Sequence, residues 1–308
     1  MRLVLVFFFL GNLFTCGQGK TIAEKLGYRA DAKLLIIHAD DLGVSHSENM
    51  ASIYAMENGP VNSGSIMVPC PWFPEIADYA KKNQTLDLGL HLTLTSEWDF
   101  YKWGPVSSRD AVTSLVNSKG YFFSSVDSLS MFAKPLEVEL ELRNQISKAK
   151  KTGIDITHLD THMAAVTGRP EYTEAYIRLG REFKLPVLLD KRILTETNEE
   201  LKSLLDDNTV MMDFIHMASP ADYENGMKEY YSSLLRKLEP GLNCLLIHLA
   251  YDNYEMKGVT INHTYYASDW RQADFDFFTS KECIEIIRQE GIVLVSWREL
   301  RDKITRTE

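Results

Sequence analysis

One stretch, LLIIHADDLG at residues 34–43, constrains the fold more than any other part of the chain. Four apolar residues in succession are typical of a strand buried on both faces, which occurs mostly in parallel sheets covered by helices. Asp40 and Asp41 follow where this strand ends. Because successive strand side chains point to opposite faces, we expect the two acids to have different roles. The alternative is that Asp41 only caps the next helix.

The composition limits the class of protein. The chain has 308 residues, of which 45% are hydrophobic, so it can bury a large core as one α/β barrel or as two smaller domains. Its formal net charge is −10, and it contains no long basic run. Since phosphate binding requires a basic surface, we predict that nucleic acid is not a partner.

Residues 1–19 have the pattern of an export signal. Arg2 precedes an apolar run at residues 3–10, and small or polar residues follow it. The run is too short to cross a bilayer, so we predict no transmembrane span. We expect residues 20–308 to form the domain of a periplasmic or extracellular protein. A lipid anchor at Cys16 and a buried N-terminal strand or helix are the less favoured alternatives.

Apolar segments and helical patterns alternate along the rest of the chain. Strands are predicted at residues 34–37, 65–68, 86–94, 154–159, 187–189, 210–215, 244–249 and 292–295. The capping-box spacing of Ser45 and Glu48 predicts that a helix begins there and runs to Asn58. Further helices are predicted after Pro74 up to Lys82, and at residues 136–151, 171–183, 199–205, 223–238 and 279–290. This order predicts a single (β/α) barrel, TIM-like, of about seven or eight strands and open to distortion. A doubly wound open sheet is the alternative, although no glycine-rich dinucleotide or phosphate-binding motif supports it.

A long segment at residues 95–134 has no clean periodicity and is rich in aromatic residues. These residues are Trp98, Phe100, Tyr101, Trp103, Tyr121 and Phe122. Long loops of this kind are often functional. The rings could stack on sugars in a carbohydrate cleft, or they could form a hydrophobic cluster that holds the loop in place.

Most of the histidines lie late in predicted strands or directly after them. They are His38, His91, His158, His162, His216 and His248. In a parallel barrel the carboxyl ends of the strands form one rim, and active sites of such barrels lie there. The pattern therefore favours a shared site over isolated core histidines.

The chain resembles the YdjC-like carbohydrate deacetylases, relatives of the polysaccharide deacetylases that include the chitooligosaccharide deacetylase. Three motifs carry the resemblance: HADDLG at residues 38–43, GLHL at residues 89–92 and THLDTH at residues 157–162. A looser match is LIH at residues 246–248. Their order and spacing make the resemblance specific.

The resemblance implies that Asp41, His91 and His162 bind one divalent metal ion, with zinc and magnesium as the leading candidates. One carboxylate and two imidazoles leave positions for water and substrate, as a hydrolytic metal site requires. The resemblance also implies that Asp40 is the general base for a water activated by the metal. His248 is then the acid that protonates the departing amine.

Three further residues receive supporting roles. We expect Asp160 and His158 to orient the metal ligands, because ligating histidines commonly donate their other ring proton to a neighbour. Arg271 either holds Asp40 ionised or forms a surface ion pair.

The implied activity is metal-dependent hydrolysis of the amide C–N bond of N-acetylated sugars or oligosaccharides. Met163-Ala164-Ala165 follow His162 where family members often have further histidines, and many family members lack an export signal. Together these two departures lead us to expect an N-acetylhexosamine glycan outside the cytoplasm rather than diacetylchitobiose. One alternative is a metal-dependent hydrolase of a phosphoester or a non-sugar amide. Another is a non-catalytic exported glycan-binding protein, which would not need a base beside the metal ligands. A homo-oligomer is left open.

Overall fold

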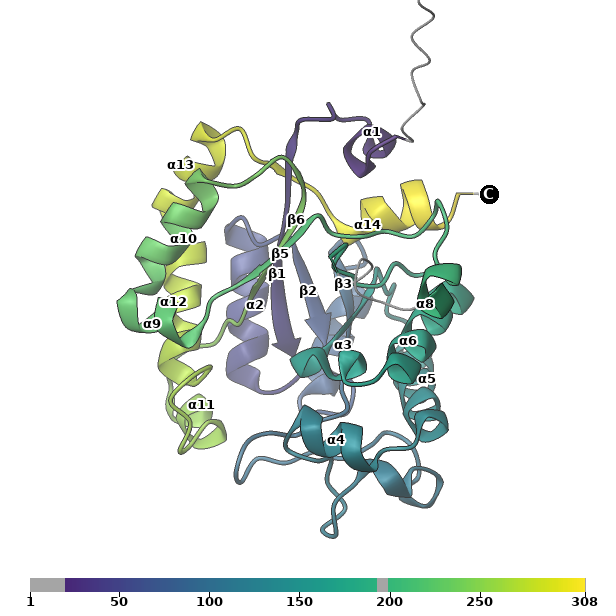
Figure 1. Cartoon of the computed structure of the whole chain (residues 1–308). Coiled ribbons are helices and arrows are strands. Elements are labelled where there is room, and N and C mark those ends of the chain that lie inside the picture. Colours follow the sequence, from purple (N-terminus) through teal and green to yellow (C-terminus); the bar gives the residue numbers. More distant parts are fainter. Residues whose placement is uncertain (1–19, 193–198, 308) are drawn as a thin grey trace, which may run out of the picture.

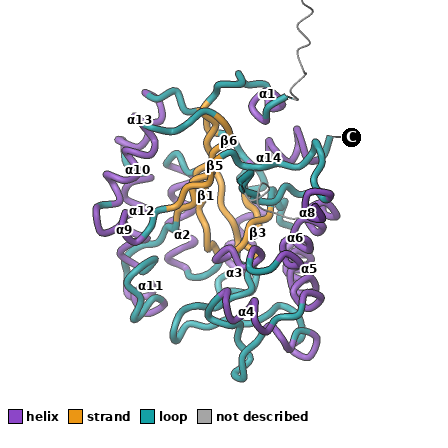
Figure 2. Tube along the Cα trace, viewed as in Figure 1, coloured by secondary structure: helices purple, strands orange, loops and turns teal. Residues whose placement is uncertain are grey.

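The computed structural model describes residues 20–192 and 199–307, and the predicted export signal lies outside this part (Figure 1). The protein is an α/β fold around a curled sheet in which the paired strands are parallel (Figure 2). The strands are β1 (Lys33–Leu42), β2 (Ser63–Ile66), β3 (Leu88–Leu92), β4 (Leu159–Thr161), β5 (Phe214–Met217), β6 (Gly241–Ile247) and β7 (Val293–Leu294). Their order is β4-β3-β2-β1-β6-β5, and β7 also pairs with β1. The long strand β1 is therefore the centre of the sheet.

Helices cover the outside of the curled sheet (Figure 1). They are α1 (Ile22–Leu26), α2 (His46–Asn58), α3 (Phe73–Lys82), α4 (Val126–Phe132), α5 (Pro135–Thr152), α6 (Pro170–Phe183), α8 (Glu199–Ser203), α9 (Pro220–Asn225), α10 (Met227–Arg236), α11 (Tyr254–Val259), α12 (Ser268–Phe278), α13 (Lys281–Gln289) and α14 (Trp297–Leu300). Helices α2, α10, α12 and α13 lie on one side, α5 and α6 lie on the other, and α4 lies beyond the carboxyl ends of the strands (Figure 1).

The prediction of an α/β fold with a parallel, barrel-like sheet open to distortion is confirmed, but the sheet does not close into a barrel of seven or eight strands. The predicted strand at residues 187–189 makes only isolated bridges, Leu159 with Val187 and Asp190 with Met212, in the described chain. Pro186 has no amide hydrogen to donate, which limits a ladder at this point. The sheet is therefore a curled half-barrel, distorted between β4 and β5.

Strand β1 is buried on both faces, as its apolar run predicts. Leu34 and Ile36 pack in one core cluster, whose members include Trp297. Leu35 and Ile37 pack in a second, larger cluster with the surrounding helices. The alternation continues through the regular pairing of β1 with β6, which extends to Ala39.

Two helix predictions need correction. The helix expected at residues 223–238 is divided at Gly226, whose φ of 106° lies outside the helical region, into α9 and α10. Helix α12 was not predicted, because its sequence SDWRQADFDFF buries polar residues such as Arg271 and Asp274 and hides the usual apolar stripe.

The strand β3 has little room beside Gly89. A Cβ atom there would lie 2.4–2.5 Å from the ring atoms of His158. Gly89→Ala should therefore lower the free energy of unfolding by about 1–3 kcal/mol, as overpacking does in other cores. Gly258→Ala is the matched control, because a Cβ at Gly258 meets no atom within 4 Å. Urea denaturation measures both, and equal stability of the two variants would contradict the prediction.

Candidate active site and metal centre

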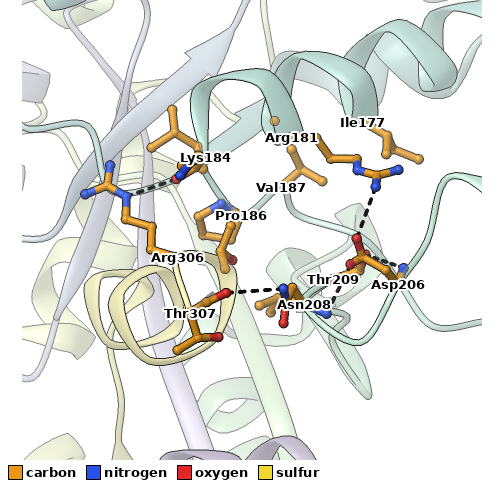
Figure 3. Close-up of a pocket in the computed structure, with 14 residues that line it drawn as sticks. Ile177, Arg181, Lys184, Pro186, Val187, Asp206, Asn208, Thr209, Arg306 and Thr307 are labelled. Carbon is orange, nitrogen blue, oxygen red and sulfur yellow. Dashed lines mark hydrogen bonds and ion pairs between the residues drawn. The ribbon is translucent and has the colours of Figure 1, made fainter.

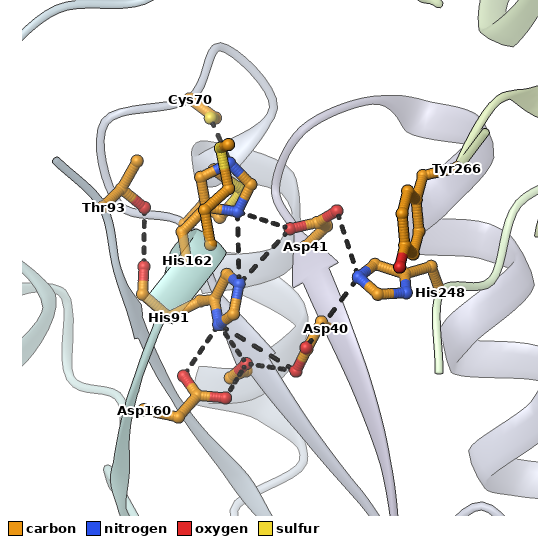
Figure 4. Close-up of polar contacts among 12 residues, drawn as sticks. Asp40, Asp41, Cys70, His91, Thr93, Asp160, His162, His248 and Tyr266 are labelled. Carbon is orange, nitrogen blue, oxygen red and sulfur yellow. Dashed lines mark hydrogen bonds and ion pairs between the residues drawn. The ribbon is translucent and has the colours of Figure 1, made fainter. Parts of the chain in front are cut away.

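Five of the predicted site residues come together at the carboxyl ends of the strands (Figure 4). Asp40 and Asp41 lie near the end of β1, and His91 lies in β3. His162 follows β4 directly, and His248 follows β6 directly. The rim expected from the strand pattern therefore exists on the half-barrel as well, because the strands remain parallel.

A bulge in β1 brings both acids into this cluster. The pairing of β1 with β2 shifts register between Ala39 and Leu42. Asp41 has a φ of 67°, a left-handed conformation that costs a residue with a Cβ about 1–3 kcal/mol. Nε2 of His248 lies 3.9 Å from Asp40 Oδ2 and 4.0 Å from Asp41 Oδ2. The expectation that the two acids point to opposite faces is wrong, because the bulge interrupts the alternation.

Three buried side chains form a candidate metal site. Asp41 Oδ1 lies 3.4 Å from His91 Nε2 and 3.2 Å from His162 Nδ1, and the two nitrogens are 3.3 Å apart. Asp41 Oδ1 is buried and has no hydrogen-bond partner among the described residues. A buried carboxylate oxygen without a partner is costly unless a cation satisfies it. The mixed oxygen and nitrogen donors fit one divalent ion of the zinc type.

Neighbouring opposite charges in this cluster shift the pKa values of its acids and histidines. Burial alone would raise the pKa of Asp41, but Arg271 and the two histidines outweigh burial and hold it well below its ordinary value. Burial would lower the pKa of His162, but Glu97 and Asp41 raise it to about 9. The pKa of His91 is likewise raised, because Asp160 and Asp40 outweigh its burial. The carboxylates thus create an environment that favours positive charge.

Asp160 contacts a predicted ligand, as expected for an orienting residue. Its Oδ1 lies 2.9 Å from His91 Nδ1. His38, to which we gave no specific role, connects Asp160 to Asp40: its Nε2 lies 2.8 Å from Asp160 Oδ2 and 3.2 Å from Asp40 Oδ1. Burial would lower the pKa of His38, but its hydrogen bonds to the carboxylates of Asp160 and Asp40 raise it to about 9. The signal was in the sequence, because strand alternation places His38 and Asp40 on one face.

The structure gives His158 and His216 other neighbours. His158 Nδ1 lies 2.9 Å from Thr157 Oγ1, and its ring stacks on Trp297 with 4.8 Å between the ring centres. His216 Nε2 lies 3.0 Å from Asn243 Oδ1. These contacts of His158 do not reach a predicted metal ligand, which corrects its assigned orienting role.

Arg271 lies beside Asp41 rather than Asp40. Its Nη2 donates to Asp41 Oδ2 at 2.8 Å, and its Nη1 donates to Glu48 Oε2 at 2.6 Å. The Arg271 side chain is only 2% exposed, so it is not a surface ion pair either. Sequence reasoning missed Glu48 because its capping-box spacing in α2 suggested another role. Ser45 does cap α2, but the Glu48 side chain turns to Arg271 instead.

Asp40 and His248 face each other. Asp40 Oδ1 contacts His38, whereas its Oδ2 lies toward His248, 3.9 Å from the His248 Nε2 (Figure 4). Burial, assisted by Arg271, lowers the pKa of His248 to about 4 against the opposing effect of the two acids. His248 is therefore neutral near pH 7 in the metal-free protein.

The aromatic segment after β3 mainly forms a hydrophobic cluster. Trp98 and Trp103 are buried and meet edge to face, with ring centres 5.5 Å apart. The Tyr101 hydroxyl donates to the carbonyl of Val44. Phe100 remains 76% exposed. The same segment places the carboxylate of Glu97 2.9 Å from His162 Nε2, beside the candidate metal site.

A separate cavity of about 260 Å³ lies away from this cluster (Figure 3). Its lining includes Leu185, which precedes the bridge at Val187, and Val210, which precedes β5. Thr307 near the end of the chain also lines it. Arg181 in its wall is already paired with Asp206. The cavity thus lies at the amino ends of the strands and does not contain the site residues.

Comparison with known proteins gives the family. The family model described as YdjC-like protein matches residues 34–289. The chain belongs to the YdjC-like family. A relative from Thermus thermophilus named carbohydrate deacetylase is 30% identical over 290 residues, which covers 92% of this chain and 99% of the relative. A carbohydrate deacetylase from Thermoanaerobacter pseudethanolicus is 29% identical over 273 residues, which covers 87% of this chain and 100% of the relative.

A solved structure has the same fold. It is the crystal structure of a candidate cellobiose-phosphate cleavage protein from Enterococcus faecalis, with a TM-score of 0.74 and 25% identity. The match covers 87% of this chain and 99% of that chain. The resemblance seen in the three motifs is thus confirmed as family membership. In the described part of the chain, every helix is too short or too polar to cross a membrane.

Proposed function

We propose that this YdjC-like protein is a metal-dependent carbohydrate deacetylase that hydrolyses the acetamide group of N-acetylated sugars. The observation that carries the proposal is the buried Oδ1 of Asp41, which lies within 3.4 Å of two histidine nitrogens but has no hydrogen-bond partner among the described residues, with a second carboxylate, Asp40, beside it. Two relatives matched over nearly their whole length are named carbohydrate deacetylases, which supports the substrate class.

A divalent cation held by Asp41, His91 and His162 would supply Lewis acidity, which activates water and polarises a carbonyl oxygen. Asp40 is the general base. His38 occupies its Oδ1, so Oδ2 takes a proton from the attacking water. Arg271 keeps Asp41 ionised, and Asp160 fixes the ring of His91 through its Nδ1. Each of these residues thus prepares one part of the attack on the acetamide carbonyl.

His248 delivers a proton to the departing nitrogen. It is neutral in the free protein, so the proton must reach it during the reaction. Asp40 Oδ2, 3.9 Å from His248 Nε2, is the nearby source, because Asp40 has just gained the proton of the attacking water. When the carbonyl carbon to nitrogen bond breaks, the nitrogen takes this proton and leaves as the amine, while the acetyl group leaves as acetate.

The alternatives fit this site less well. A phosphoester would bring negative charge, but Arg271, the guanidinium that contacts the cluster, already donates to two carboxylates. A glycan-binding protein without catalysis would not need the buried Asp40 next to the ligand set. Amide hydrolysis uses both features.

The test is product release from defined substrates. Protein loaded with zinc or magnesium should release acetate from N-acetylated oligosaccharides and should not release phosphate from p-nitrophenyl phosphate. Because residues 1–19 have the pattern of an export signal, we propose that the substrate lies outside the cytoplasm, and the panel should include such glycans. Phosphate release without acetate release would overturn the proposal in favour of the phosphoesterase.

Metal uptake should depend on pH. His162 has a raised pKa of about 9 in the metal-free protein, so it carries a proton near neutral pH, and a cation must displace that proton. Affinity should therefore rise as the pH rises toward about 9, where His162 loses its proton. Isothermal titration in two buffers of different ionisation enthalpy should detect release of at least one proton per ion. An affinity that does not change as the pH rises would contradict the assignment of His162.

A further inference from the structure

Glu97 contacts the ring of His162 from the side opposite the candidate metal site. His162 Nδ1 faces Asp41 Oδ1 at 3.2 Å, whereas His162 Nε2 lies 2.9 Å from Glu97 Oε2. We propose that Glu97 is a positioning residue that fixes His162 for metal binding and links the metal site to the segment after β3. This inference rests on the proposed metal site of Asp41, His91 and His162.

The chemistry of imidazole makes this contact specific. A neutral histidine carries one ring proton, so a histidine that binds a cation through Nδ1 must carry its proton on Nε2. The carboxylate of Glu97 accepts a hydrogen bond from that Nε2 and so stabilises the tautomer that binding requires. His91 has the opposite arrangement, with its Nε2 toward Asp41 and its Nδ1 against Asp160. Each proposed histidine ligand thus has its own carboxylate.

The backbone explains why His162 needs this support. His162 directly follows the short strand β4, and the next two residues, Met163 and Ala164, both have a φ of 53°. Residues with a Cβ rarely adopt this left-handed conformation, so the chain leaves the sheet in a strained turn. Glu97 contacts the far end of the ring, where the strand does not constrain it.

The two supporting carboxylates differ in where they lie. Asp160 is in β4 and is buried, whereas Glu97 lies in the segment after β3 and its side chain is 18% exposed. Neighbours of Glu97 are fixed within the same segment: Trp103 Nε1 donates to the Thr95 carbonyl at 2.8 Å. The ring of Trp103 also meets His162 edge to face, with ring centres 6.1 Å apart. A displacement of this segment would therefore move the support of His162.

The test measures zinc binding rather than activity. We expect Glu97→Ala to raise the Kd for Zn²⁺ by about 10–100-fold in competition with a chromophoric chelator, as loss of such a partner does at other metal sites. Glu97→Gln keeps an oxygen acceptor without the charge, so it should raise the Kd by less. Glu75→Gln is the matched control, because Glu75 pairs with His46 Nδ1 at 2.7 Å outside the site, and it should bind zinc like the wild type.

Two further measurements distinguish a positioning role of Glu97 from a general loss of the fold. Circular dichroism should show that all three variants are folded without metal, and the visible absorption of bound Co²⁺ should change in Glu97→Gln but not in Glu75→Gln. Wild-type zinc affinity and an unchanged Co²⁺ spectrum in both Glu97 variants would overturn the inference and leave the proposed function intact. Failure of the wild type to bind zinc or cobalt would instead overturn the metal site and the proposed function.

Discussion

Asp41→Asn is expected to abolish metal binding and deacetylation together. Asparagine keeps the size and one oxygen of the side chain, but it removes the negative charge that faces His91 and His162. It also leaves the buried Arg271 with Glu48 as its remaining carboxylate partner. Because Asp41 is itself a ligand in this account, the Kd for zinc should rise by more than the about 100-fold seen when a supporting residue is lost. Metal content by elemental analysis and acetate release would show the two losses in the same preparation.

The control for this variant is Asp78→Asn, which removes an exposed carboxylate that pairs with Lys82 outside the site. It should retain metal and activity. Circular dichroism must show that Asp41→Asn remains folded, because removal of one partner of a buried ion pair is destabilising. One bound zinc ion per chain in folded Asp41→Asn would contradict its role as a ligand.

Asp40→Asn is expected to keep the metal and lose turnover. An amide cannot accept the proton of the attacking water, so kcat should fall by about 10²–10⁴-fold, the usual contribution of a general base. Asp40 is outside the set Asp41, His91 and His162, whose donor atoms converge. Zinc stoichiometry should therefore stay the same, and KM should change little. Steady-state kinetics and elemental analysis on one sample provide both measurements.

The contrast between the two neighbouring acids tests the division of roles. If Asp40→Asn retains full activity, Asp40 is not the base. If it loses zinc to the same extent as Asp41→Asn, the acids act as one unit and the assigned division fails. His38→Gln should lower kcat by less than Asp40→Asn does. His38 contacts Asp40 Oδ1, whereas Oδ2, the oxygen proposed to take the proton, lies toward His248.

The parts of the molecule that could be predicted depend on local patterns. The apolar run of β1 and the periodic spacing in α5 and α6 identified their elements, because burial on both faces or on one stripe leaves a direct trace in the sequence. The rim at the strand ends followed from the parallel arrangement alone. Closure of the barrel could not be predicted, because it depends on the pairing of residues 187–190 with segments far away in the chain.

The parts that could not be predicted depend on backbone detail and long-range contacts. A run of strand-forming residues does not reveal that Asp41 adopts a φ of 67°. The predicted orientation of its side chain was therefore wrong. Arg271 lies 230 positions from Asp41 in the chain, and its choice of Asp41 over Asp40 is decided by packing of α12 against α2. Glu97 was overlooked for the same reason, because an acid within an aromatic loop carries no local sign of its histidine partner.

Crystals grown with zinc and measured at the zinc absorption edge would show whether Asp41, His91 and His162 bind the ion. We expect one anomalous peak within about 2.0–2.3 Å of Asp41 Oδ1, His91 Nε2 and His162 Nδ1 together. The peak should be absent in Asp41→Asn and retained in Asp40→Asn. A zinc peak bound by other residues, or none in active wild-type protein, would contradict the account.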